Sequence, residues 1–102
     1  MWRLLAAVAL LAAPGLAAGH AFPAHSAPRA GHTVGASPPA VRIWFDGQLE
    51  PVFSTIRVEN PHRERVDKRN ARVDPGDQTL LEVSLPPLPP GPYRVFWSVV
   101  AR

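Results

Sequence analysis

Proline is the feature that most limits what this chain can fold into. The sequence has 13 prolines in 102 residues, and all but Pro14 lie after residue 20. Proline lacks the N–H that a helix interior needs, and its ring clashes with the preceding turn. No segment of this part keeps the 3.6-residue apolar period of an amphipathic helix either. Long helices are therefore excluded, and the prolines instead mark turns between short segments that alternate in polarity, as strands do.

Four of these segments are expected to be strands, at residues 40–45, 53–58, 79–85 and 93–100. Three of them place apolar residues at every second position, so that these residues share one face: Val41, Ile43 and Phe45; Leu81, Val83 and Leu85; Tyr93, Val95, Trp97 and Val99. Short strands separated by proline and glycine turns predict an all-β protein, an antiparallel β-sandwich.

The beginning of the chain has the pattern of a secretory signal peptide. One arginine precedes an apolar run that ends near Pro14, and small residues follow as far as Gly19. The apolar run is too short to cross a bilayer comfortably. We predict a signal-peptide helix over residues 1–19, cleaved after Gly19, and a single domain over residues 20–102. Cleavage after Ala18 and an uncleaved N-terminal anchor are the alternatives.

The composition excludes several classes of protein. There is no cysteine, so disulfides, thiolate metal sites and cysteine nucleophiles are all ruled out. The charged run at residues 62–69 mixes both signs, which is typical of a solvated hairpin tip and argues against a nucleic-acid partner. Neither a Gly-x-Ser-x-Gly elbow nor a glycine-rich phosphate loop occurs, and the chain is not expected to be an enzyme.

Several motifs, taken in order, carry a resemblance to a known family. They are His20-Ala21-Phe22, residues 26–31, residues 38–45, Glu50-Pro51-Val52-Phe53-Ser54 and the proline-rich approach to Tyr93-Arg94-Val95-Phe96-Trp97. From His20 to Arg102 the chain resembles the CopC family of periplasmic copper-resistance proteins. The resemblance implies a Greek-key, Ig-like β-sandwich, a periplasmic location and binding or carriage of Cu(II) in copper homeostasis. It also implies a membrane copper transporter of the CopD type as a partner.

His20 is the first candidate metal ligand, because cleavage after Gly19 would make it the N-terminal residue. The α-amine and the imidazole Nδ1 of one residue can then close on a single metal ion. Two such nitrogens, another imidazole and a carboxylate suit tetragonal Cu(II), for which affinity is highest among first-row divalent metals. The alternative interpretation is that His20 is only the residue left at the cleavage site, where it is solvated and binds no metal ion.

The other ligands that the resemblance implies are incomplete in this sequence. The family has a glutamate where this chain has Gly47, and Asp46 beside it is the candidate replacement, although strand alternation directs it to the opposite face unless a bulge forms at Gly47. The family's aspartate and histidine, and its last strand, follow a stretch that corresponds to the final residues, Val99–Arg102. The methionine-rich Cu(I) loop of some members is absent, because Met1 is the only methionine.

The remaining histidines, His25, His32 and His62, are expected at the surface rather than in a metal site. In an extended chain His25 would lie roughly 16 Å from His20, beyond the reach of one metal ion.

Three alternative interpretations stay open at this point. The chain could be a copper oxidase with a histidine brace, a truncated sandwich that binds no metal, or the outer domain of a membrane copper importer. A missing last strand would also leave the edge of the strand at residues 93–100 unpaired, which favours self-association.

Overall fold

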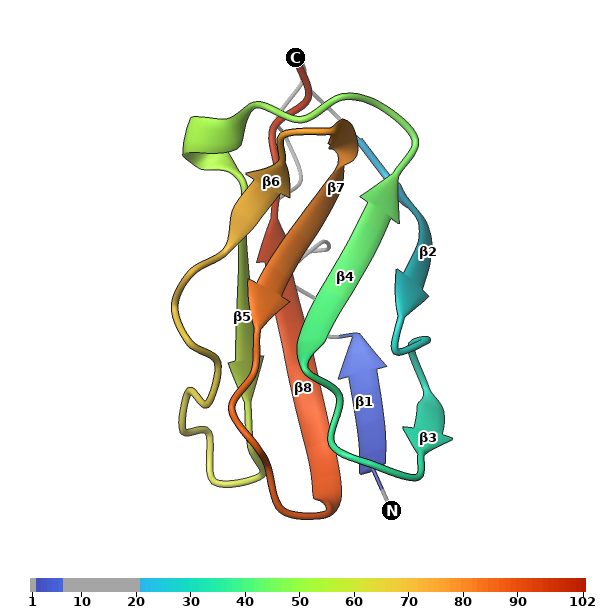
Figure 1. Cartoon of the computed structure of the whole chain (residues 1–102), viewed down its shortest axis with the longest axis vertical. Helices are drawn as coiled ribbons and strands as arrows, with labels where there is room; N and C mark the ends of the chain where they lie inside the picture. Colours follow the sequence, from blue (N-terminus) through green and yellow to red (C-terminus); the bar gives the residue numbers. More distant parts are fainter. Residues whose placement is uncertain (1, 7–20) are drawn as a thin grey trace.

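The computed structural model describes residues 2–6 and 21–102, which form two four-stranded β-sheets (Figure 1). The elements are β1 (Trp2–Ala6), β2 (Pro23–Ala27), β3 (His32–Val34), β4 (Ala40–Phe45), the 3-10 turn η1 (Pro51–Phe53), β5 (Thr55–Glu59), β6 (Arg72–Asp74), β7 (Asp77–Ser84) and β8 (Gly91–Ser98). One sheet has the order β3-β1-β8-β5 and the other β2-β4-β7-β6. Every pair is antiparallel except β1 with β8, which is parallel. The described residues include no helix long and apolar enough to cross a membrane.

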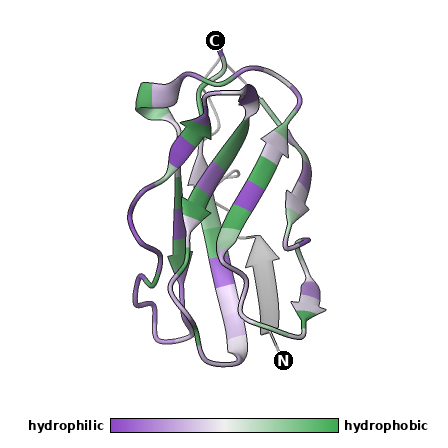
Figure 2. Cartoon of the chain, viewed as in Figure 1, coloured by the Kyte–Doolittle hydropathy of each residue, from purple (hydrophilic) through white to green (hydrophobic). Residues whose placement is uncertain are grey.

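The alternating residues of the strands form the core between the two sheets. Figure 2 shows the alternation of hydrophobic and hydrophilic residues along β4 and β7. All of the apolar residues that the sequence places on shared faces are buried, and the core consists of Ala21, Val41, Ile43, Phe45, Leu49, Ile56, Val58, Leu81, Val83, Leu85, Tyr93, Val95, Trp97 and Val99. The all-β sandwich is therefore confirmed, with its strands held by the burial of one face of each sheet.

The proline-rich approach to β8 is fixed by two hydrogen bonds. The hydroxyl of Tyr93 donates to the carbonyl of Pro89 at 2.6 Å, and burial raises the pKa of this phenol above its ordinary value. The N–H of Leu88 donates to the hydroxyl of Ser37 at 3.0 Å. The two bonds give partners to the N–H of Leu88 and the carbonyl of Pro89. They thereby hold the segment that leads into β8 in place.

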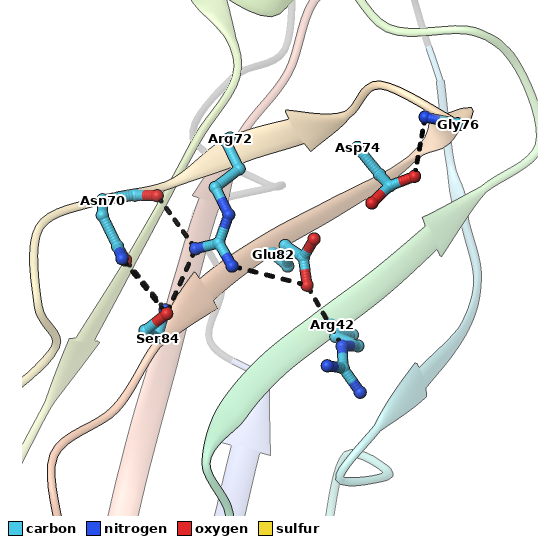
Figure 3. A network of polar contacts seen from close by, with 7 residues as sticks. All are labelled: Arg42, Asn70, Arg72, Asp74, Gly76, Glu82 and Ser84. Carbon is cyan, nitrogen blue, oxygen red and sulfur yellow. Dashed lines mark hydrogen bonds and ion pairs between the residues drawn. The ribbon is translucent and has the colours of Figure 1, made fainter.

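A polar network covers the outer face of the sheet β2-β4-β7-β6 (Figure 3). Glu82 on β7 lies opposite both Arg42 on β4 and Arg72 on β6. Its Oε1 accepts from Nε of Arg42 at 3.1 Å and lies 3.7 Å from Nη2 of Arg72. Asn70 and Arg72 both bond to Ser84. These side chains form ion pairs and hydrogen bonds across β4, β7 and β6, so we interpret the network as one that stabilises the pairing of the three strands.

Two observations differ from the expectation for the N-terminal segment and the last strand. Trp2–Ala6 is a strand rather than part of a helix, and residues 7–20 lie outside the described residues. The edge of β8 that was expected to be open pairs with β1 from Gly91 to Val95. Unpaired N–H and C=O groups along an apolar edge favour the pairing of any extended segment within reach.

Two local expectations are also corrected by the structure. The second expected strand begins at Thr55 instead of residue 53, because Pro51 starts a 3-10 turn that leaves Phe53 65% exposed. The charged run at residues 62–69 is mostly exposed, but the side chain of Asp67 within it is fully buried. This carboxylate accepts hydrogen bonds from Val58, Arg65 and Arg69.

Candidate functional site

Three segments that are distant in the sequence meet at one end of the sandwich. The chain preceding β2, the turn that follows β4 and the last residues of the chain all lie at the upper end in Figure 1. The N–H of Glu50 donates to the carbonyl of Val100 at 2.7 Å, and the N–H of Arg102 donates to the carbonyl of Gln48 at 2.9 Å. Because the backbone of residues 46–50 contacts the other two segments, it organises this end.

Asp46 follows β4 directly and is tied to the start of the domain by two hydrogen bonds. Its N–H donates to the carbonyl of Phe22 at 2.9 Å, and its Oδ1 accepts from the N–H of Phe22, also at 2.9 Å. Asp46 is exposed, and within the described residues it makes no ion pair. The carboxylate therefore lies beside the chain that follows His20, while keeping access to solvent.

His20 itself lies outside the described residues. The next residue, Ala21, is only 3% exposed and belongs to the core. Burial of Ala21 and the two hydrogen bonds of Phe22 anchor the chain within two residues of His20.

Glu50 is a second carboxylate at this end, and the sequence interpretation did not include it among the ligands. Its Oε2 lies 3.9 Å from Nε of Arg102, a long separation for an ion pair that is largely solvated. The guanidinium of Arg102 is held by Gln78, whose Oε1 accepts from Nη1 at 2.9 Å. The only signal in the sequence was the position of Glu50 within the motif that precedes Pro51.

The other three histidines are exposed on different elements. His25 on β2 stacks on Trp44 of β4, with 4.5 Å between the ring centroids and 13° between the planes. His32 lies on β3, and His62 is in the turn after β5, where its N–H donates to Oδ1 of Asn60. Within the described part of the chain, no three histidine, aspartate or glutamate residues come close enough to hold a metal ion.

Comparison with known proteins identifies the family. The model of the CopC domain matches residues 24–102. The chain belongs to the CopC family. Its fold agrees with the crystal structure of CopC from Methylosinus trichosporium OB3b, with a TM-score of 0.74, 29% sequence identity and coverage of 80% of this chain and 79% of that one.

Two curated relatives extend the comparison. Protein YobA of Escherichia coli strain K12 is 35% identical over 83 residues, which cover 80% of this chain and 67% of YobA. Copper transport protein CutJ of Bacillus subtilis strain 168 is 27% identical over 101 residues, which cover 98% of this chain but 19% of CutJ. Membership of the CopC family, with a copper transport protein among the relatives, supports a copper-related function.

The described residues at this end of the sandwich do not by themselves form a metal site. Asp46 carries an exposed carboxylate there, beside the chain that follows His20.

Proposed function

We propose that the exported CopC domain begins at His20 and binds Cu(II) in the periplasm for copper homeostasis and resistance. The ligands are the α-amine and imidazole of His20 and the carboxylate of Asp46. Cleavage of residues 1–19 creates the amine, so the intact mass of the exported protein is the first check on this proposal.

The observation that carries the proposal is the pair of hydrogen bonds between Asp46 and Phe22. Two residues of chain extend at most about 7 Å, so the amine nitrogen of His20 lies within that distance of the Phe22 nitrogen, whose N–H donates to Asp46. The second oxygen of Asp46 has no ion pair with any described residue to compete with a metal ion. This geometry supports Asp46 as the replacement for the glutamate that the family has at the position of Gly47.

The chemistry of these groups favours Cu(II) over the other common divalent ions. A deprotonated amine and a neutral imidazole are nitrogen donors, and together with a carboxylate they match the preference of Cu(II). Cu(II) stands at the top of the affinity order for such ligands. Because the amine must lose a proton to bind, binding releases protons and weakens in acid.

Replacing Asp46 with asparagine is expected to weaken Cu(II) binding by about 100-fold, since the variant loses one anionic ligand. An asparagine Oδ1 can still accept the N–H of Phe22, so the local fold is preserved. The affinity is measured by titrating Cu(II) into the exported chain against a competing chelator of known affinity.

Glu64→Gln is the matched control for this experiment. Glu64 is also an exposed carboxylate that accepts one hydrogen bond, from Asn60 at 2.9 Å, but it lies in the loop after β5 at the opposite end of the sandwich (Figure 1). This variant should bind Cu(II) as the parent does. If the parent and Asp46→Asn bind Cu(II) with equal affinity, Asp46 is not a ligand.

A membrane copper transporter of the CopD type is the partner that we propose for metal transfer. The similarity to part of the copper transport protein CutJ supports a functional connection of this domain to membrane transport. Exposed apolar side chains also occur near the proposed site, at Phe22, Val52 and Phe53. Such residues are candidates for contact with another protein.

A further inference from the structure

The chain between β5 and β6 forms a basic loop, residues 60–70, at the lower end of the sandwich in Figure 1. Its cationic residues are Arg63, Arg65, Lys68 and Arg69, and its acidic residues are Glu64 and Asp67. Arg65 is paired with the buried carboxylate of Asp67 at 2.9 Å. Arg63, Lys68 and Arg69 are exposed and form no ion pair with any described residue. The basic loop thus presents cations that an anionic partner can reach.

Hydrogen bonds hold the backbone of the basic loop at both of its ends. At the start of the loop, Oδ1 of Asn60 accepts two backbone N–H groups, at 2.9 and 3.0 Å. Near its end, Asp67 accepts the N–H of Arg69 at 2.7 Å. The N–H of Lys68 donates to the carbonyl of Ser84 on β7 at 2.9 Å. The exposed cations therefore project from a backbone whose shape is fixed by the fold.

Two of these cations occupy backbone positions that ordinarily favour glycine. The angle φ is 63° at Arg63 and 58° at Arg69, in the left-handed region where a residue with a Cβ is disfavoured. Residues that are kept in such conformations cluster at functional sites. The presence of arginine at both positions supports a role for the two guanidinium groups.

The opposite end of the sandwich carries mostly negative charge. Asp46 and Glu50 lie there, and Asp74 and Asp77 flank the turn between β6 and β7 at the same end (Figure 1). Arg102 is a cation beside Glu50. An anionic partner is therefore attracted to the basic loop and repelled from the end that we propose to bind copper. A partner on the basic loop leaves the other end open.

We propose that the basic loop is a docking surface for a carboxylate-rich segment of another protein. The planar guanidinium group matches a carboxylate in a two-bonded geometry, so arginines on a fixed backbone suit carboxylates whose positions are also fixed. A membrane with anionic headgroups attracts cations by charge alone, and it does not require arginine at strained backbone positions. The inference does not depend on the proposed copper site.

The test measures the affinity of the exported protein for a fluorescent poly-glutamate peptide by anisotropy. We expect binding that weakens as salt is raised from about 0.02 M to about 0.2 M, because exposed charges are screened. Arg63→Gln and Arg69→Gln should each weaken binding by about threefold and the double variant by about tenfold, since exposed ion pairs are individually weak. Arg29→Gln is the matched control, because Arg29 is exposed between β2 and β3 and has no ion pair with a described residue. It should bind as the parent does.

A glycine variant separates binding from folding. Arg63→Gly/Arg69→Gly relieves the backbone at both positions, so it should melt no lower than the parent and still lose affinity as the double glutamine variant does. Equal affinity of the parent and the double glutamine variant would overturn the proposal, and so would an equal loss in Arg29→Gln. Binding of the parent to phosphatidylglycerol vesicles without binding to the peptide would also overturn it, because the loop would then recognise a membrane surface.

Discussion

Replacing His20 with alanine is expected to weaken Cu(II) binding by about 100-fold or more. The variant keeps an N-terminal amine but loses the imidazole that closes the chelate ring. Loss of a group that merely supports a ligand typically reduces metal affinity by about 10- to 100-fold, so loss of a ligand itself should reach at least the upper end of that range. The affinity is measured on the exported chain, after its mass has established where the chain begins.

His62→Ala is the control for this prediction, because His62 is an exposed histidine in the turn after β5. It removes an imidazole without changing the amine or the end of the sandwich that carries Asp46. If His62→Ala lost affinity and His20→Ala retained it, copper would be bound by side-chain histidines, and the proposed site would be wrong.

Replacing Asp67 with alanine is expected to destabilise the fold by about 2–3 kcal/mol, because it removes the acceptor of a buried N–H and the partner of a partly exposed arginine. The side chain of Asp67 is fully buried and accepts three hydrogen bonds: from the N–H of Val58 at 2.9 Å, from Nε of Arg65 at 2.9 Å and from the N–H of Arg69 at 2.7 Å. Alanine leaves the buried N–H of Val58 without its acceptor, which carries a desolvation cost. Urea or thermal unfolding measures the change.

Asp74→Ala is the matched control for Asp67→Ala. Asp74 also accepts a backbone N–H, that of Gly76 at 2.9 Å, but at an exposed turn. We expect this variant to lose no more than about 1 kcal/mol, because water can replace the carboxylate. Equal losses in the two variants would show that the burial of Asp67 has no special role.

The stability supplied by Asp67 also depends on pH. Burial by itself would raise its pKa, but the hydrogen bonds from Arg65, Val58 and Arg69 outweigh burial and hold the pKa below the ordinary value of 3.8. A lowered pKa means that this contribution is fully present above the ordinary value and is lost as the pH falls through the folded-state value. The difference in stability between the parent and Asp67→Ala should therefore narrow in strong acid and stay constant near neutrality.

The strands in which apolar and polar residues alternate could be predicted from the sequence, because this alternation is visible within each segment alone. The expected segment at residues 40–45 coincides with β4, and the apolar positions of β7 and β8 are buried as the pattern indicates. The short edge strands β2, β3 and β6 were not predicted, since they have five, three and three residues and show little alternation. Their pairing with longer strands defines them.

The roles of Asp46 and Asp67 depend on contacts that the sequence does not display. Asp46 reaches Phe22 across 24 positions, so its place beside the start of the domain depends on the pairing of β2 with β4. Alternation along one strand did not indicate that contact. Asp67 lies in a run of charges that is typical of a solvated turn, and its hydrogen bond from the N–H of Val58 on β5 is a contact that the run itself does not indicate.

The central claim, that the His20 amine holds Cu(II), is tested most directly by measuring Cu(II) affinity with the amine free and with the amine acetylated. Both forms begin at His20, keep every side chain and differ in one donor. We predict that acetylation abolishes most of the binding, and that binding to the free form weakens as the pH falls below about 7.7, where the amine is protonated. An acetylated chain that binds Cu(II) as tightly as the free chain would contradict it.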